Sequence, residues 1–195
     1  MRPDPRAWDD YVTAFARVAE RVSAQLAGVD RKLLPVRLYV AGGAALHLRT
    51  GARLTEDIDG VFSRRVVLDD DITVAYKGPD GRGRLLYLDR NYNDTLGLMH
   101  EDAYKDAEPV ELPGVDSRVL EVRLLTPLDL AVSKLARFGE QDRQDIELLA
   151  RERLIDARRL RRRAEEALAG YVGNLEAVRT SIDLACNLVK AIQAR

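Results

Sequence analysis

Two glycines and two aspartates are the residues whose spacing first suggests chemistry. Gly42 and Gly43 follow an apolar stretch, Leu38–Ala41, that predicts a buried strand, and helix-forming residues follow the glycines. Glycine at a strand-to-helix junction lets the backbone approach a ligand and leaves the first helical N–H groups free for an anion. Asp57 and Asp59 are two residues apart on the next predicted strand, so both carboxylates leave the same face.

Two carboxylates on one face repel each other unless a cation lies between them. A hard divalent ion, Mg²⁺ or Mn²⁺, is held by carboxylate oxygens together with substrate phosphates. A glycine junction followed by an acid pair therefore predicts a metal-dependent site for a nucleoside triphosphate.

The stretch from Gly42-Gly43 to Asp57-Ile58-Asp59 resembles the first motif of the polymerase-β-type nucleotidyltransferase superfamily. Residues 49–59 are similar to the AbiEii-like and MenT-type toxin nucleotidyltransferases, and the resemblance extends over residues 36–149. It implies an α/β (α+β) fold, in which a mixed sheet is flanked by helices and followed by a helical C-terminal lobe. Gly60 stands where that family usually has a hydrophobic residue, which indicates a bulge or a close contact.

The resemblance implies a third carboxylate, Glu121, on a predicted strand over residues 119–124. If that strand lies beside the strand of the aspartates, Glu121 would bind metal with Asp57 and Asp59; otherwise it is an ordinary exposed glutamate. An arrangement in which Glu121 points elsewhere, or in which the two aspartates are locked in salt bridges without an opening for a triphosphate, would overturn the prediction of an enzyme. The residues that the resemblance assigns to the nucleotide are Gly42, Gly43, Arg53, Thr55, Lys134 and Asp145.

Lys134 and Asp145 belong to two predicted helices. The first covers residues 128–138 after a Thr126 cap and Pro127, and the second begins near residue 141. A mobile ammonium group suits a triphosphate, and a carboxylate within reach would hold the lysine charged and aimed. A surface lysine and aspartate on amphipathic helices is the structural alternative.

The other elements are predicted from apolar periodicity. A helix over residues 3–27 packs on the sheet, and strands 72–76 and 85–88 form a hairpin without recognisable chemistry. Helices over residues 155–169 and 175–192 complete the chain, and the N-terminal helix or a partner protein would cover the apolar stripe of the last one. The segment 91–113 has no clear assignment. The expected domains are a catalytic core, 1–125, and a helical lobe, 126–195.

Composition predicts a cytoplasmic globular protein. The chain has 195 residues, of which 46% are hydrophobic and 32% charged, and no apolar run of membrane-spanning length. The single cysteine, Cys186, excludes an internal disulfide and is expected to be buried.

The partner classes stay open at this stage. A net charge of −1 would not attract nucleic acid, although seven arginines lie between Arg151 and Arg163. That run is either a solvated helix face or an RNA-binding patch. The resemblance to toxins implies transfer to the 3′ end of tRNA and an antitoxin partner. Modification of a protein with AMP or of a small molecule is the alternative, and a non-catalytic nucleotide-binding module is disfavoured because all three carboxylates are present.

Overall fold

The computed structural model describes residues 1–68, 71–89, 91–92 and 97–194. The chain divides into two compact units. The first contains Met1–Tyr92 and Ala107–Leu124, and the second contains Asn93–Asp106 and Leu125–Arg195. A mixed sheet and several helices confirm the predicted fold class.

The first unit contains a six-stranded sheet in the order β3-β4-β2-β1-β6-β5. The strands are β1 (Val36–Val40), β2 (Asp57–Phe62), β3 (Thr73–Lys77), β4 (Gly83–Asp89), β5 (Glu108–Pro109) and β6 (Leu120–Leu124). β2 runs antiparallel to β1 and parallel to β4, while β1 runs parallel to β6. β3 and β4 form the predicted antiparallel hairpin, and β5 pairs antiparallel with β6.

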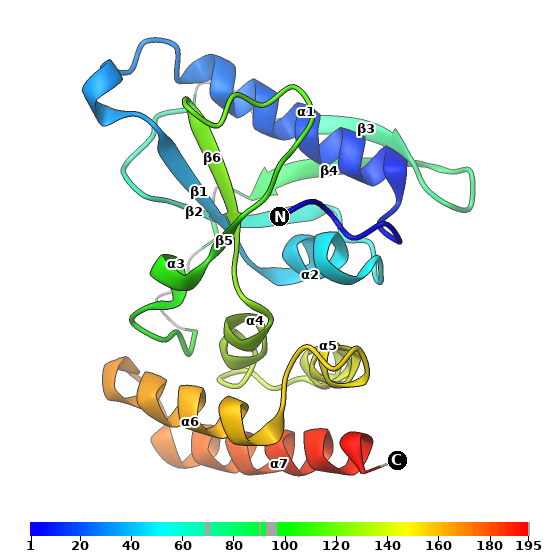
Figure 1. Cartoon of the computed structure of the whole chain (residues 1–195), viewed down its shortest axis with the longest axis vertical. Coiled ribbons are helices and arrows are strands. Elements are labelled where there is room, and N and C mark those ends of the chain that lie inside the picture. The colour runs from blue at the N-terminus through cyan, green and yellow to red at the C-terminus, as the bar shows by residue number, and fades with distance from the viewer. Residues whose placement is uncertain (69–70, 90, 93–96, 195) are drawn as a thin grey trace. The chain divides into compact units, whose positions relative to one another are not determined.

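Helix α1 (Asp9–Gln25) covers one face of this sheet. It lies along β3 and β4 (Figure 1). Its buried side chains recur at the three-four spacing of one helix face, and the strand residues of the covered face, Leu38, Ile58 and Leu86 among them, are also buried. The helix begins at Asp9 rather than at residue 3, because Pro5 disfavours a helical conformation of the residue before it, Asp4.

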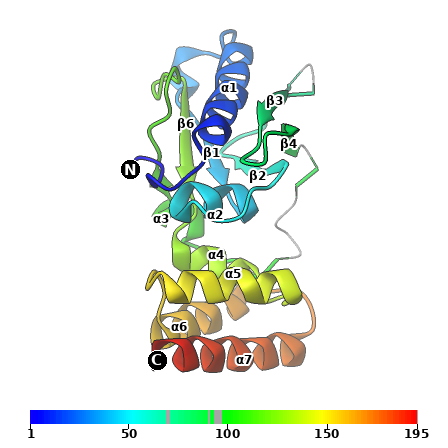
Figure 2. The ribbon, with the colours of Figure 1, turned by 90° about the vertical axis from the view of Figure 1, so that its right-hand side faces the viewer.

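Helix α2 (Gly42–Thr50) connects β1 to β2 and contacts β2 (Figure 2). His47 fixes its far end. The Nε2 atom of His47 accepts a hydrogen bond from the Trp8 N–H at 3.0 Å, and Nδ1 lies 3.1 Å from the Ala52 carbonyl oxygen. This pattern fits a neutral imidazole with its proton on Nδ1. Burial lowers the pKa of His47, which keeps the ring in that form.

The second unit is helical. Its elements are α3 (Ala103–Asp106), α4 (Pro127–Ser133), α5 (Glu140–Arg151), α6 (Ala157–Ala167), η2 (Leu168–Gly170) and α7 (Leu175–Gln193); the first unit also contains the short η1 (Arg31–Leu33). Helix α4 ends at Ser133, earlier than predicted, and the chain reaches Gly139 through a left-handed Phe138 with φ of 46°.

The apolar stripe of α7 is buried within the second unit. Helices α5 and α6 pack against it (Figure 2), so the prediction that the N-terminal helix covers it was wrong. Cys186 on α7 is fully buried, as expected. In the described part of the chain, no helix is both long and apolar enough to cross a membrane.

Candidate functional site

Gly42 brings the backbone directly against the Asp59 carboxylate. Its φ is +59°, and a Cβ atom built at this position would lie 1.8 Å from Asp59 Oδ2. Only glycine accepts both the left-handed conformation and this contact without displacing the acid. The glycine junction and the second aspartate are therefore parts of one structure, as their spacing predicted.

Gly43 has a similar relation to Thr55. A Cβ atom at Gly43 would lie 3.0 Å from the Cβ of Thr55, and the Thr55 hydroxyl donates a hydrogen bond to Asp57 Oδ1. The first turn of α2 thus packs on the loop that leads into β2. Arg53 lies in this loop, where its side chain is exposed and its φ is 54°.

Asp57 and Asp59 leave the face of β2 that α1 does not cover. Ile58, between them, is buried on the α1 side, whereas both aspartates are half-buried. The Ala41 N–H donates to the Asp59 carbonyl oxygen at 2.9 Å, which places this end of β2 beside the start of α2. The acid pair and the two glycines therefore form one candidate site in the first unit.

The hairpin contributes two side chains that sequence reasoning missed. In the parallel pairing of β2 with β4, Asp57 lies opposite Tyr87 and Asp59 lies opposite Asp89. Paired residues share a face of the sheet, so Tyr87 and Asp89 belong to the face of the acid pair. The Asp57 carboxylate, followed by burial, raises the pKa of the Tyr87 hydroxyl. The sequence did contain a signal for these residues, because the alternating pattern of β4 ends on an aspartate. The strand that pairs with β4 could not be inferred from the sequence.

Glu121 does not join the acid pair. The strand β1 lies between β2 and β6, so the expectation that the strand of Glu121 lies beside that of the aspartates was wrong. Glu121 is opposite Arg37 at the start of β1, while Asp59 is beside Ala41 at its end, about 13 Å away along the strand at the usual rise per residue. Glu121 is also held by Arg37 at 2.9 Å and by Arg123 at 2.8 Å.

Lys134 and Asp145 form an ion pair inside the second unit. Lys134 Nζ lies 2.6 Å from Asp145 Oδ2 and 3.9 Å from Asp142 Oδ1, and Lys134 is only 7% exposed. Burial works against the charge of Asp142, but hydrogen bonds from Arg137 and the Gly139 N–H lower its pKa overall. The expected carboxylate near Lys134 is present, whereas the lysine lies at the buried end of α4 instead of on a polar helix face.

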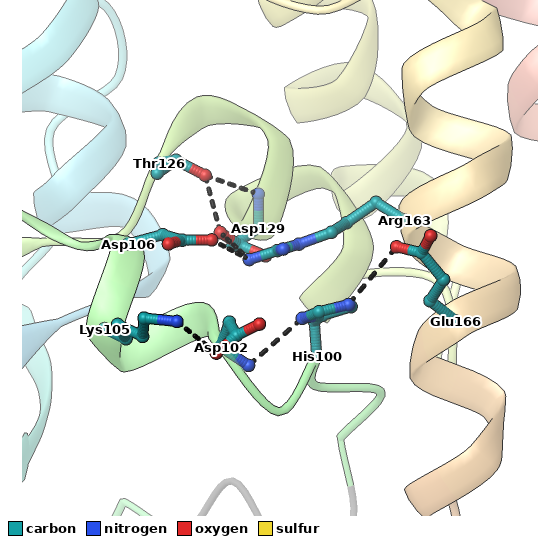
Figure 3. Close-up of polar contacts among 8 residues, drawn as sticks. All are labelled: His100, Asp102, Lys105, Asp106, Thr126, Asp129, Arg163 and Glu166. Atoms are coloured by element: carbon teal, nitrogen blue, oxygen red, sulfur yellow. Dashed lines mark hydrogen bonds and ion pairs between the residues drawn. The ribbon is translucent and has the colours of Figure 1, made fainter.

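Most of the arginine run is engaged with carboxylates. Arg163 contacts Asp129 and Asp106, each at 2.8 Å (Figure 3), and the Asp129 carboxylate also accepts the Thr126 hydroxyl. Arg161 contacts Asp183 at 2.7 Å. Within the described ranges, the arginines of this run without a carboxylate at ion-pair distance are Arg153, Arg158 and Arg162. The exposed basic surface is therefore smaller than the sequence suggests.

His100 connects the segment before α3 to helix α6. Its Nε2 lies 3.3 Å from Glu166 Oε2, and its Nδ1 accepts the Asp102 N–H at 3.1 Å (Figure 3). Both ring nitrogens are thus occupied. Part of the segment 91–113, which had no assignment from sequence, therefore packs with the helical unit; its residues 93–96 lie outside the described chain.

The acid pair fits a divalent metal ion that is shared with a substrate. Carboxylate oxygens are the ligands that Mg²⁺ prefers, and Asp57 and Asp59 present them on one face. Across the described ranges, no three histidine, cysteine or acidic side chains lie close enough to hold an ion. An ion at this site would take its other ligands from phosphate and water, as Mg²⁺ usually does in phosphoryl-transfer sites.

Comparison with known protein families matches residues 17–187, a range that contains both the glycine junction and the acid pair. Searches of curated proteins and of solved structures give no match. Nucleotidyltransferases generally use a nucleoside triphosphate and a divalent metal ion, in agreement with the chemistry of the site. Because the match covers most of the 195 residues, the chain belongs to the family described as nucleotidyltransferase of unknown function (DUF6036).

Proposed function

We propose that this protein transfers a nucleotide monophosphate from a nucleoside triphosphate to an acceptor hydroxyl, at the site formed by Gly42, Gly43, Asp57 and Asp59. The observation that carries the proposal is the contact between Gly42 and the Asp59 carboxylate. It places the N-terminus of α2, a part of a helix that favours anions, against one of two acids that share a face.

The residues of the candidate site in the first unit have separate proposed roles. Asp57 and Asp59 would hold the divalent ion, and the Thr55 hydroxyl orients Asp57. The backbone at Gly42 and Gly43 would lie against the triphosphate, and Arg53 would add positive charge to it. When bound, the ion would neutralise phosphate charge and make the acceptor hydroxyl more acidic. Positioning and electrostatics would then account for the rate, since phosphoryl transfer needs little covalent work from the protein.

For Lys134 and Asp145 we place structural support of the helical unit ahead of direct contact with phosphate. The ammonium group is buried, and Asp145 holds it at 2.6 Å. Asp89, which lies opposite Asp59 in the sheet, would add a carboxylate on the β4 side of the acid pair.

Transfer to the 3′ end of tRNA by a toxin with an antitoxin partner is the specific form of this activity that the motif resemblance suggests. Arg153, Arg158 and Arg162 are the exposed cations available for RNA in the arginine run. Transfer of AMP to a protein and transfer to a small molecule use the same site and are distinguished by where the nucleotide is found.

The test is a labelling reaction with each of the four nucleoside triphosphates, Mg²⁺ or Mn²⁺, and total RNA or cell extract. We expect metal-dependent incorporation of label that Asp59→Asn reduces by at least about a hundredfold, a loss typical of removing a group that acts on the reacting phosphate. Label at the size of tRNA supports an RNA acceptor, and label only on protein supports modification with AMP.

Glu121→Gln is the matched control, because it also removes one carboxylate charge from the sheet. It should keep incorporation within about threefold of the wild-type level, as expected of a group outside the site. Equal losses in both variants, or incorporation without added metal after treatment with a chelator, would contradict the assignment of Asp59.

A further inference from the structure

The side chains of β4 alternate between a covered and an open face of the sheet. Leu86 and Leu88 are buried beneath α1, whereas Leu85 is 53% exposed and Tyr87 is 40% exposed on the opposite face. Along this face Tyr87 lies nearer to the acids than Leu85 does, because Tyr87 is opposite Asp57 in the pairing of β4 with β2.

Tyr87 lies beside the acid pair, and Asp89 is the next residue of β4 on the same face. The strand register places Tyr87 opposite Asp57 and Asp89 opposite Asp59. The Asn91 N–H donates to Asp89 Oδ1 at 2.8 Å, which holds this carboxylate at the end of β4. An aromatic ring and a fixed carboxylate thus stand next to the site of the proposed reaction.

A hollow of about 300 Å³ opens where β3 begins and β4 ends. Its lining includes Asp71, Thr73, Tyr87, Asp89 and Asn91. This volume lies at the lower end of the range of small-molecule sites, enough for one ring with its substituents. Among the described residues that line the hollow, Asp71 and Asp89 are the charged ones, and both are negative. Arg21 of α1 donates to the Thr73 carbonyl oxygen at this edge.

The sheet order decides which substrate this side of the site would receive, on the basis of the proposed function. The glycine junction at the end of β1 lies on one side of Asp59, and β4 lies on the other. In phosphoryl transfer, the attacking and leaving oxygens are roughly in line on opposite sides of the phosphorus. If the leaving pyrophosphate lies against Gly42 and Gly43, the attacking hydroxyl comes from the side of β4.

We propose that the acceptor enters from the β4 side and that its hydroxyl-bearing ring rests on Tyr87, with the hollow beside Asp89 selecting an uncharged or cationic ring over an anionic one. A nucleoside at the end of an RNA chain and an amino sugar both have this chemistry. Tyr87 is accordingly a residue that determines acceptor binding and takes no part in binding the donor triphosphate.

The experiment measures binding of three small probes by saturation-transfer NMR, with the full chain, Mg²⁺ and a non-hydrolysable triphosphate analogue occupying the donor site. Uridine represents a nucleoside, glucosamine represents an amino sugar, and uridine 3′-monophosphate carries an anion on the same ring as uridine. We expect uridine, glucosamine or both to bind, and uridine 3′-monophosphate to bind more weakly than uridine.

Two variants and a control isolate the ring of Tyr87. Tyr87→Ala should weaken binding of the uncharged or cationic probe by about fivefold or more, the effect of losing one ring that stacks on an aromatic side chain. Tyr87→Phe keeps the ring and should stay within about twofold of the wild-type protein, because stacking does not need the hydroxyl. Leu85→Ala, which truncates another exposed side chain on the same face of β4, should leave binding unchanged.

The outcomes separate this inference from the proposed function. Failure of the triphosphate analogue to bind the wild-type protein would overturn the proposed function. Bound analogue with no probe binding would overturn the inference alone. So would an unchanged Tyr87→Ala, an equal loss in Leu85→Ala, or tighter binding of uridine 3′-monophosphate than of uridine.

Discussion

Replacing Gly42 with alanine tests the geometry of the site most directly. The added methyl group would lie 1.8 Å from Asp59 Oδ2, far inside van der Waals contact, and the residue would keep a φ of +59°. Either Asp59 must move away from its position beside the junction, or the first turn of α2 must move. Both changes alter the position of the first turn of α2 relative to the acid.

The cost in stability should be moderate and the cost in activity large. A left-handed conformation costs a non-glycine residue about 1–2 kcal/mol. For a chain of this size, that corresponds to a melting temperature lower by roughly 2–8 °C. A displacement of about 1 Å in a group that positions a reacting phosphate can reduce the rate about a hundredfold. We therefore expect a folded protein with very low nucleotide transfer.

The assay compares Gly42→Ala with Gly83→Ala by thermal unfolding and by incorporation of labelled nucleotide. Gly83 begins β4 in the same sheet, and a Cβ atom there meets nothing within 4 Å, so its substitution should change neither measurement appreciably. A Gly42→Ala protein with wild-type transfer would refute the reasoning. It would mean that the contact with Asp59 is not needed for the reaction.

Two further predictions concern buried titratable side chains. Burial lowers the pKa of His47 below its ordinary value of about 6.5, so its contribution to the free energy of unfolding is complete above that pH and is lost as the pH falls through the lowered pKa. Urea unfolding at pH 7.5 and 5.5 should therefore show a larger loss at low pH for the wild-type protein than for His47→Gln, and equal losses would contradict the neutral form. Asp145→Asn, which leaves the Lys134 ammonium group buried without its 2.6 Å partner, should lower the free energy of unfolding by about 3–5 kcal/mol. The free energy of unfolding should fall less in the double variant Lys134→Met/Asp145→Leu. If the single variant Lys134→Met has wild-type stability but no longer binds triphosphate, Lys134 has a direct role in the nucleotide site instead.

Local pattern was sufficient to predict most of the longer elements and the common face of the two aspartates. The alternation in β2 placed Asp57 and Asp59 on one face, because side-chain direction in a strand depends only on position along it. The close approach at Gly60 is also present: a Cβ atom there would meet Leu38 Cδ1 at 2.7 Å, so this glycine fits beneath a core side chain.

Strand order was not available from local pattern. Which strands become neighbours depends on contacts between residues far apart in the chain, and the same alternating strand can pair on either side of a sheet. The prediction for Glu121 assumed that β6 lies next to β2, and the hairpin was interpreted as having no recognisable chemistry. The buried position of Lys134 was also missed. The helical pattern predicted that the helix continues to residue 138, but α4 ends at Ser133 and Lys134 is the residue that follows it.

The position of Glu121 was expected to decide for or against an enzyme, but the proposed reaction does not require this residue. Arg37 and Arg123 each bind one oxygen of Glu121, and Glu121 lies opposite the start of β1, whereas Asp59 lies beside its end. The chemistry does not depend on that one residue, because Mg²⁺ needs only one or two carboxylates when phosphates complete its ligands. β4 places Asp89 opposite Asp59, on the side from which an attacking hydroxyl would approach. β4 thus supplies a further acid next to the pair on β2, and the family that matches residues 17–187 is described as a nucleotidyltransferase.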